Sequence, residues 1–403
     1  MSPSPNPVLL FASYHAYLDH SSGAALATRD LFEDLTAQGW KCRVVCGPAL
    51  DYQDGRGPAD VLHEHQIPHH IECCAPHNGT RYTLFHYVLN GVSVTQYRPE
   101  TFDPHRPPTQ DEGVPFLDVI SRACGRFQPD LVLTFGGPPI GQYLIHRVKR
   151  AGKRVLFCLH NLDYQGRDLF EEVDAIWVPS EFARRTYRER LGLETHAITL
   201  PWDRNRIRAT PNGQGHVTFI NPIPAKGMAW FARIVLEVSR RRLDIPFLVV
   251  EGRGRVQTLR QLDLNLSGVK NLYVMRSTPR PWEFYAMSRV VLIPSLCDDA
   301  YPRVGCEALT NGLPVLATRR GGLPEVLGEA GFLFDVPPLY TTRYLDVPSA
   351  SEVAKWVETI ERLWDDSAFY AEHRAKALAR AKVWEPDRLR PGVEAFLRRI
   401  VAR

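Results

Sequence analysis

The sequence has no uninterrupted apolar run close to the ~20 residues that a membrane-spanning helix needs. Its first five residues, Met-Ser-Pro-Ser-Pro, lack the basic start and apolar core of a secretory signal peptide. Charge of one sign is not in large excess either, because 49 Lys and Arg residues against 45 Asp and Glu give a net charge of +4. That charge is too small and too dispersed to indicate nucleic-acid binding, although it leaves peripheral contact with an anionic membrane open. We therefore expect a cytoplasmic protein with no nucleic-acid partner.

The sequence also gives little indication of disulfides or of a metal site. None of the eight cysteines forms a C-x-x-C pair, and several lie in apolar runs where a thiol behaves as a small hydrophobe, so we expect reduced, structural cysteines. The histidines and cysteines between His63 and Cys74 suggest zinc ligands. However, the local pattern predicts a helix ending at Gln66 and a strand over His70–Cys73, which points successive side chains to opposite faces. We predict no metal site and no cofactor.

What the sequence does contain is a repeated alternation of short apolar runs and helical patterns. At 403 residues, with 44% hydrophobic and 23% charged residues, the chain suits two globular domains of roughly 150–200 residues. Apolar runs without polar alternation indicate strands buried on both faces of a parallel sheet. Helical spacing such as Ala24, Thr28, Leu31 and Leu35 lies between them. The predicted strands are Val8–Phe11, Arg43–Cys46, Leu131–Phe135, Val155–Leu159, Ala175–Val178, Ala197–Leu200, Val217–Ile220, Phe247–Val250, Leu272–Met275, Val290–Ile293 and Pro314–Ala317.

This alternation predicts an α/β fold with two Rossmann-like, doubly wound domains. The polar, turn-rich stretch Pro201–Gly215 interrupts the pattern, so we expect residues 1–205 to form one domain and residues 206–385 the other, with a helix over 386–403 returning to the first. Two such domains would place the carboxyl ends of their strands on either side of one cleft. Loops are expected at Pro76–Tyr97 and at the proline-rich stretch Pro99–Gly113.

Tyr14 and His15 follow the first predicted strand, so two interpretations are open. Their side chains either line the cleft or pack within a loop of their own domain.

The most informative stretch is Ile293–Asp335, which reads IPSLCDDAYPRVGCEALTNGLPVLATRRGGLPEVLGEAGFLFD. A strand ends at Pro294, a loop with Asp298 and Asp299 follows, and a helix begins near Arg303. The N–H groups at a helix start form an anion site suited to a diphosphate. Glu307, on the first turns of that helix, is suited to a pair of sugar hydroxyls because a carboxylate accepts two donors. Gly321-Gly322 would let the backbone approach a ligand closely.

The stretch closely resembles glycosyltransferase family 4, retaining nucleotide-sugar-dependent enzymes of the GT-B fold. The family motif has two acidic residues eight positions apart, then a helix, a P-V-[VL]-A strand and a G-G-x-P-E turn. Asp299, Glu307, Pro314–Ala317 and Gly321–Glu325 match those positions. The resemblance implies that Asp299 contacts the transferred sugar and that Glu307 holds the nucleotide ribose. It also implies that Tyr301, Arg303, Val304, Gly321 and Gly322 contribute to donor binding.

A second resemblance opens the second predicted domain, where Ile220–Gly227 (INPIPAKG) is similar to the family's G-R-x-x-x-x-K-G segment. There an Arg and a Lys neutralise the donor diphosphate, which implies that Lys226 does so here. Asn221 stands where the Arg is usual and is also expected among the donor-binding residues, and Arg303 is a candidate substitute for the missing cation. The family's E-P-F-G appears here as Asp299-Ala300-Tyr301-Pro302, a change that concerns the identity of the donor sugar.

The first domain carries weaker matches. Ser21-Ser22-Gly23 precedes the first helix where the family has a Gly-rich turn, which implies that the backbone of Gly23 touches the donor phosphate. His160 follows the strand Val155–Leu159 and matches the family's histidine over the transferred sugar. Ser180 is expected to cap the N-terminus of a helix.

The resemblance implies transfer of a hexose-type unit from a nucleoside diphosphate sugar to an acceptor hydroxyl, with retention and without metal, with His160, Lys226 and Asp299 in catalysis. The acceptor is not specified: a glycan, a lipid, a small molecule or a peptide would all fit. Two alternatives share the fold, namely a nucleotide-sugar epimerase and a non-catalytic sugar-nucleotide-binding protein. A phosphorylase-like enzyme is disfavoured by the short chain.

Overall fold

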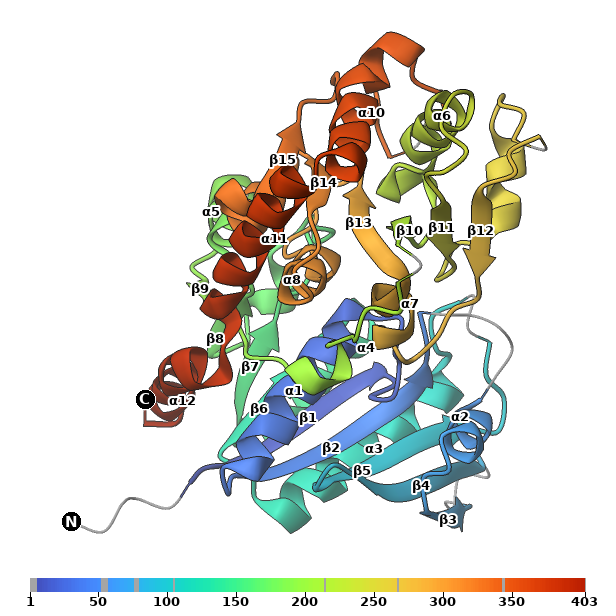
Figure 1. Ribbon diagram of the computed structural model, residues 1–403. Helices are drawn as coiled ribbons and strands as arrows, with labels where there is room; N and C mark the ends of the chain where they lie inside the picture. The colour runs from blue at the N-terminus through green and yellow to red at the C-terminus, as the bar shows by residue number, and fades with distance from the viewer. Residues whose placement is uncertain are drawn as a thin grey trace. The chain divides into compact units, whose positions relative to one another are not determined.

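The structure is a computed structural model that describes residues 6–51, 57–75, 80–103, 106–213, 215–266, 268–342 and 345–402. It divides into two compact units, which we call the N-terminal domain (Met1–Trp202 with Pro386–Arg403) and the C-terminal domain (Asp203–Glu385). Each is built on its own sheet, as Figure 1 shows. The predicted fold class, two Rossmann-like α/β domains, is confirmed.

The sheet of the N-terminal domain has, among the described residues, nine strands in the order β3-β4-β5-β2-β1-β6-β7-β8-β9. Alternate residues of β1 fill two separate cores: Leu9 and Phe11 on one face, Leu10 and Ala12 on the other, all at most 1% exposed. Burial on both faces explains why these strands read as continuous apolar runs. The strands are β1 (Val8–His15), β2 (Lys41–Ala49), β3 (His69–Cys74), β4 (Tyr82–Leu89), β5 (Val92–Pro99), β6 (Leu131–Thr134), β7 (Arg154–Cys158), β8 (Ala175–Val178) and β9 (His196–Ala197).

Helices cover both faces of this sheet, as expected for a doubly wound fold. They are α1 (Gly23–Ala37), α2 (Pro58–Glu64), α3 (Gln110–Phe127), α4 (Ile140–Arg150), α5 (Glu181–Leu191) and α12 (Pro386–Ala402). Residues of α1, α2 and α12 share one core with the sheet, whereas α3 and α4 pack on each other and on β1. The last helix, α12, buries Phe396 and Leu397 in that core, and Arg390 donates two hydrogen bonds to Asp34 of α1 (2.9 and 2.7 Å).

The expectation of a loop at Pro76–Tyr97 is wrong for its described part. Strands β4 and β5 form an antiparallel hairpin there, joined by Asn90 and Gly91, both with positive φ (48° and 85°). Two such residues match the twist of a two-residue hairpin turn. Residues 76–79 lie outside the described residues. In addition, α3 begins at Gln110, inside the stretch Pro99–Gly113 that was expected to be a loop.

The sheet of the C-terminal domain has, in the described part of the chain, six parallel strands in the order β12-β11-β10-β13-β14-β15. The chain adds strands outward from β10 to β12, then returns to pair β13 with β10 on its other side. The strands are β10 (His216–Ile220), β11 (Phe247–Val250), β12 (Leu272–Met275), β13 (Ser288–Ile293), β14 (Val315–Thr318) and β15 (Gly331–Phe334). This reversal creates a topological switch point between β10 and β13, the place where open α/β sheets bind ligands.

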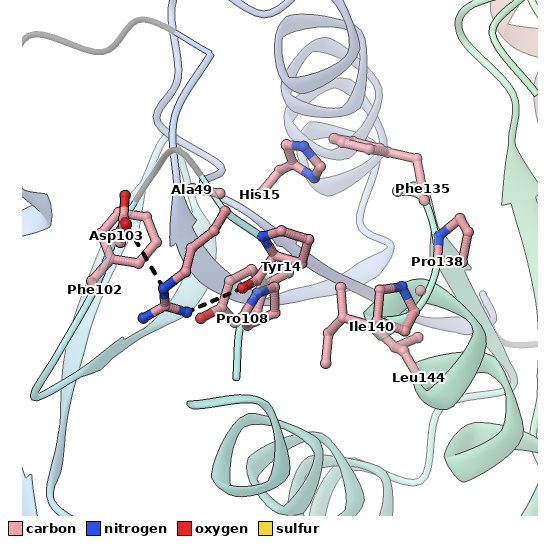
Figure 2. A pocket seen from close by; sticks show the side chains of 16 residues that line it. Tyr14, His15, Ala49, Phe102, Asp103, Pro108, Phe135, Pro138, Ile140 and Leu144 are labelled. Atoms are coloured by element: carbon pink, nitrogen blue, oxygen red, sulfur yellow. Dashed lines mark hydrogen bonds and ion pairs between the residues drawn. The ribbon is translucent and has the colours of Figure 1, made fainter. Parts of the chain in front are cut away.

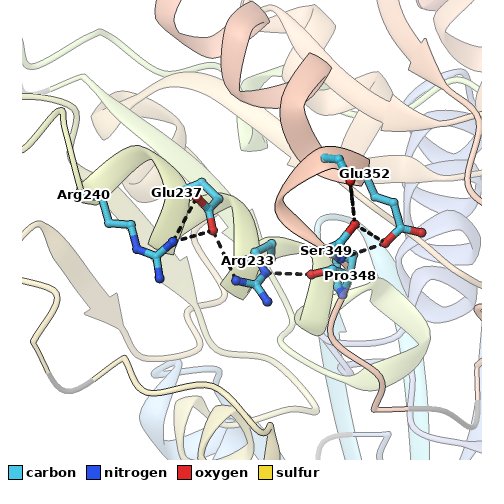
Figure 3. Close-up of polar contacts among 7 residues, drawn as sticks. Arg233, Glu237, Arg240, Pro348, Ser349 and Glu352 are labelled. Carbon is cyan, nitrogen blue, oxygen red and sulfur yellow. Dashed lines mark hydrogen bonds and ion pairs between the residues drawn. The ribbon is translucent and has the colours of Figure 1, made fainter.

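Helices again cover both faces. One face packs on α6 (Met228–Ser239) and α10 (Ala350–Asp365), and the other on α8 (Arg303–Thr310) and α9 (Leu323–Leu327), while α11 (Ser367–Ala381) packs on α8 and α10. The remaining helix is α7 (Trp282–Met287). Polar contacts tie α6 to the start of α10: Arg233 donates to the Pro348 carbonyl (2.7 Å), and Ser349 caps α10 with Glu352 (Figure 3). Within the described residues, no helix combines the length and apolar character needed to span a membrane.

Candidate donor-binding site

The loops after β10 and β13 lie against each other at the switch point of the C-terminal domain. The backbone N–H groups of Leu296 and Cys297 both donate to the Ala225 carbonyl (2.9 and 3.1 Å). Gly227 has φ +79°, and a Cβ there would lie only 1.8 Å from the Pro294 carbonyl oxygen. Such a close approach admits only glycine. The short 3-10 helix Pro224–Lys226 is therefore fixed against the loop that carries Asp299.

This contact brings Lys226 and Asp299 together, although they are 73 positions apart in the sequence. Lys226 Nζ lies 2.5 Å from Asp299 Oδ1, and Ser295 Oγ lies 3.5 Å from Asp299 Oδ2. The two charged side chains remain 22% and 23% exposed, so a ligand can reach both.

A third loop, after β14, completes this part of the site. The Gly322 N–H donates to the Asp299 carbonyl (2.8 Å), and a Cβ on Gly321 (φ +58°) would lie 2.6 Å from the Asp299 nitrogen. Both predicted glycines thus serve a close approach of backbone to backbone within the protein. Whether they also contact the donor stays a prediction.

Helix α8 begins in the same loop. Its N-cap residue, Pro302, makes no side-chain hydrogen bond to the first turn. The helix start that carries Arg303 and Val304 therefore keeps the character of an anion site.

Glu307, one turn further along α8, is only 8% exposed, and both of its carboxylate oxygens have partners. Oε2 accepts a hydrogen bond from the Tyr285 hydroxyl (3.0 Å), and Oε1 lies 3.3 Å from Arg303 Nε. Burial, with a smaller contribution from the charge of Glu307, holds the pKa of Tyr285 well above its usual range, so its hydroxyl stays a donor. These partners fix the orientation of the carboxylate, a group that can accept more than one hydrogen bond per oxygen.

Tyr285 was not identified from the sequence. It belongs to α7 and carries no motif signal, so only the fold shows that it contacts Glu307.

Asn221, which stands where the resembling family has an arginine, has a structural role. Its backbone is left-handed (φ 64°), and its Oδ1 accepts a hydrogen bond from the Gly254 N–H (2.9 Å). Asparagine tolerates that conformation better than most residues. Arg303 pairs with Glu307, and its role as a substitute cation remains a prediction.

Tyr301 also has a hydrogen-bond partner within the protein. Its hydroxyl accepts a hydrogen bond from the indole N–H of Trp384, which leads into α12. Its predicted contact with the donor remains untested.

Gly23 and His160 lie in the N-terminal domain. Gly23 starts α1 and is exposed, and Asp19 holds the preceding turn by accepting from Ser21 N and Oγ (2.8 and 2.7 Å). His160 follows β7, and its ring packs edge-on against Phe135 and Trp177, with centroids 5.4 and 4.9 Å away. Their roles toward the donor stay predictions.

No group of three or more His, Cys, Asp or Glu side chains is arranged to hold a metal ion among the residues that the structure describes. In the segment that suggested zinc ligands, Glu72 Oε2 lies 3.0 Å from His86 Nε2 of the neighbouring strand. Glu72 therefore contacts His86 on the sheet surface, and the hydrogen bond between them holds the pKa of Glu72 below its usual range.

The C-terminal domain matches the model of a known family. Residues 214–366 match the model of the glycosyl transferases group 1 family. Spore coat protein SA of Bacillus subtilis is 33% identical over 109 residues, which cover 26% of this chain and 28% of the relative. A GDP-mannose-dependent phosphatidylinositol monomannoside mannosyltransferase of Mycolicibacterium smegmatis is 26% identical over 169 residues, 40% of each chain. The chain thus matches well under two thirds of the length of these curated relatives.

Solved structures match along nearly the whole chain. Anabaena HepE in complex with UDP and glucose superposes with a TM-score of 0.67 at 15% sequence identity, over 97% of this chain and 99% of that one. Sucrose-phosphate synthase of Thermosynechococcus elongatus gives the same TM-score at 14% identity, over 98% and 99% of the two chains. The predicted resemblance is confirmed: residues 214–366 match the model of the group 1 glycosyl transferases, and the chain as a whole has the GT-B fold.

Proposed function

We propose that the chain transfers a hexose-type sugar from a nucleoside diphosphate sugar to an acceptor hydroxyl, with retention at the anomeric carbon and without a metal ion. The observation that carries the proposal is the pairing of Lys226 with Asp299 at the β10–β13 switch point, beside the start of α8. A cation and helix N–H groups suit a diphosphate, and the two nearby carboxylates suit sugar hydroxyls.

Each of these residues has a distinct task in the proposal. Lys226, Arg303 and the amides at the start of α8 hold the diphosphate. Glu307, oriented by Tyr285, accepts hydrogen bonds from the ribose, and Asp299 accepts from the transferred sugar. As the glycosidic bond breaks, negative charge grows on the departing diphosphate, and the fixed cation and helix amides stabilise that charge more in the transition state than in the ground state. The departing phosphate oxygen then takes the proton of the acceptor hydroxyl.

The N-terminal domain supplies the acceptor side in this proposal. His160 lies over the transferred sugar, and the backbone at Gly23 contacts the donor phosphate. The acceptor itself is a glycan, a lipid, a small molecule or a peptide.

The decisive experiment is a donor screen on the full chain. UDP-glucose, UDP-N-acetylglucosamine and GDP-mannose are tested for binding by calorimetry and for turnover by release of the nucleotide. One donor is expected to bind and be consumed, and Lys226→Ala should lower kcat/KM for that donor by roughly 10²–10³-fold, the scale for loss of one preorganised charge contact. Lys270→Ala, which removes an exposed lysine of the same domain, is the matched control and should leave kcat/KM unchanged.

The other outcomes contradict the proposal in distinct ways. An epimerised nucleotide sugar formed without any acceptor would identify an epimerase. Donor binding with neither transfer nor hydrolysis would identify a non-catalytic binding protein. Full activity of Lys226→Ala would remove that residue from the site.

A further inference from the structure

Tyr301 stands where the resembling family has a phenylalanine, and its additional hydroxyl has a defined partner. The residue lies between β13 and α8, two positions after Asp299. We call residues 298–302 the sugar loop, because they include the residue predicted to contact the transferred sugar. The Tyr301 hydroxyl accepts a hydrogen bond from the indole N–H of Trp384, which is 83 positions further along the chain. A phenylalanine at this position would leave that N–H without its acceptor.

Trp384 is buried and held firmly in place. Its side chain is 1% exposed and ends the 3-10 helix Lys382–Trp384, so its N–H is shielded from water and requires an acceptor within the protein. The guanidinium of Arg380, on α11, lies 5.7 Å from the centroid of the indole ring, within cation–π range. Arg380 also donates to the carbonyls of Glu325 and Val326 in α9 (2.6 and 2.9 Å). The indole is therefore packed against a side chain that is itself bound to α9.

The sugar loop is held from a second side by the loop after β14. The Asp299 carbonyl accepts from the Gly322 N–H (2.8 Å). Ala300 is 3% exposed, and a Cβ on Gly322 would lie 2.7 Å from the Ala300 carbonyl oxygen. The loop after β14 thus closes on Asp299 and Ala300, and Trp384 holds the residue that follows them. Loss of the Trp384 contact would leave the sugar loop fixed on one side alone.

The position of the Asp299 carboxylate matters for the proposed reaction. This carboxylate pairs with Lys226 and, in the proposed function, accepts from the transferred sugar. A misplacement of about 1 Å at a reacting centre lowers a rate by up to ~10²-fold. The backbone bond between Asp299 and Gly322 limits any displacement, so we expect a smaller effect, on the scale of one neutral hydrogen bond.

We propose that Trp384 is a positioning residue of the transfer reaction, which holds Tyr301 and thereby the sugar loop, so that Asp299 meets the transferred sugar. Trp384 acts through Tyr301 and not on the sugar itself. The inference rests on the proposed function, because it assigns a support to the sugar contact of that site.

The test uses the full chain and the donor that is consumed in the donor screen. Trp384→Phe keeps an aromatic ring but removes the N–H, and Tyr301→Phe removes its acceptor. Each variant should lower kcat by about two- to tenfold. The double variant should fall no further than the more affected single variant, because both changes remove the same hydrogen bond. The affinity for the free nucleoside diphosphate should change less than about twofold, since Lys226 and the start of α8 hold the diphosphate.

Trp356→Phe is the matched control. Trp356 is also 1% exposed, but it belongs to α10, which packs on the sheet face opposite to α8. The control removes the same atoms from the core of the same domain, so it should lower the melting temperature and leave kcat unchanged. If Trp384 contributed only to stability, Trp384→Phe would behave like Trp356→Phe, and Tyr301→Phe would keep full turnover.

A second measurement needs no donor. Amide hydrogen exchange of a peptide that contains the sugar loop, followed by mass spectrometry, should be faster in Trp384→Phe and Tyr301→Phe than in the parent chain or in Trp356→Phe. Unchanged exchange in both variants, an unchanged kcat in Tyr301→Phe, or additive losses in the double variant would each overturn the inference. A parent chain that consumes no donor would instead refute the proposed function, and the exchange rates would still decide whether Trp384 holds the loop.

Discussion

Replacing Asp299 by Asn should make the protein bind a free nucleoside diphosphate more tightly, while transfer is lost. The Lys226 ammonium is paired with the Asp299 carboxylate at 2.5 Å, so a diphosphate must compete for it. Both side chains are about one-fifth exposed, so solvent screens the attraction between them. We therefore take the free energy of this ion pair as about 1 kcal/mol, the upper end of the range for exposed ion pairs. Releasing Lys226 from that competition should raise the affinity about fivefold. Turnover of the nucleotide sugar should fall, because Asp299 no longer accepts from the sugar with full charge.

Calorimetry with the nucleoside diphosphate at fixed ionic strength measures this change directly. Asp298→Asn is the matched control, since it removes the same charge from an exposed neighbouring position in the same loop and should change the affinity less than twofold. Lys226→Ala should shift the affinity in the opposite direction. A weaker affinity in Asp299→Asn, or an equal gain in Asp298→Asn, would refute the reasoning.

The other predictions follow from the same neighbourhood. Tyr285→Phe should weaken nucleoside diphosphate binding about tenfold in calorimetry, because Glu307 loses the hydrogen bond that orients it, whereas the exposed Tyr273→Phe should not. Asn221→Arg should lower the free energy of unfolding in urea by about 2–3 kcal/mol, because the left-handed backbone and the bond to Gly254 are both compromised; unchanged unfolding would remove that structural role. Burial and, secondarily, the charge of Asp299 raise the pKa of Cys297 to about 11, so iodoacetamide at pH 8 should alkylate it slowly and faster in Asp299→Asn, as peptide mass spectrometry would show; rapid alkylation of the parent chain would contradict this.

Much of the fold could be predicted from local patterns. Strands such as Val217–Ile220 and Phe247–Val250 are buried on both faces, so their apolar runs are uninterrupted and easily recognised. The capping role expected of Ser180 is confirmed, because its hydroxyl accepts from the Ala183 N–H at 3.0 Å. These features depend on a few neighbouring residues.

The β4–β5 hairpin was missed although it carries a usable signal. Asn90-Gly91 between two β-rich segments is a strong indication of a hairpin turn. The polar residues within both strands and the nearby prolines made the stretch resemble a loop.

From the sequence, only those residues of the candidate site that belong to a recognised motif could be predicted, because the motif places them at the ends of particular strands. Lys226 and Asp299 could be assigned by resemblance, but their mutual contact depends on the Gly227 turn against Pro294. The contact of Tyr285 with Glu307, and the pocket that Tyr14 and His15 line with the loop after β6 and the start of α4 (Figure 2), arise from long-range packing. No local pattern in the sequence encodes either.

The return of α12 to the N-terminal domain affects the order of events during synthesis. The core shared by α1, α2 and the sheet is completed only by Phe396, Leu397 and their neighbours, which follow the whole C-terminal domain in the chain. A ribosome adds about 5–20 residues per second, so the roughly 180 intervening residues take about 10–40 s. During that interval the face that will receive α12 is exposed on the nascent chain. A chaperone that shields apolar surface should therefore associate with ribosome-bound chains ending near residue 385 more than with released full-length protein.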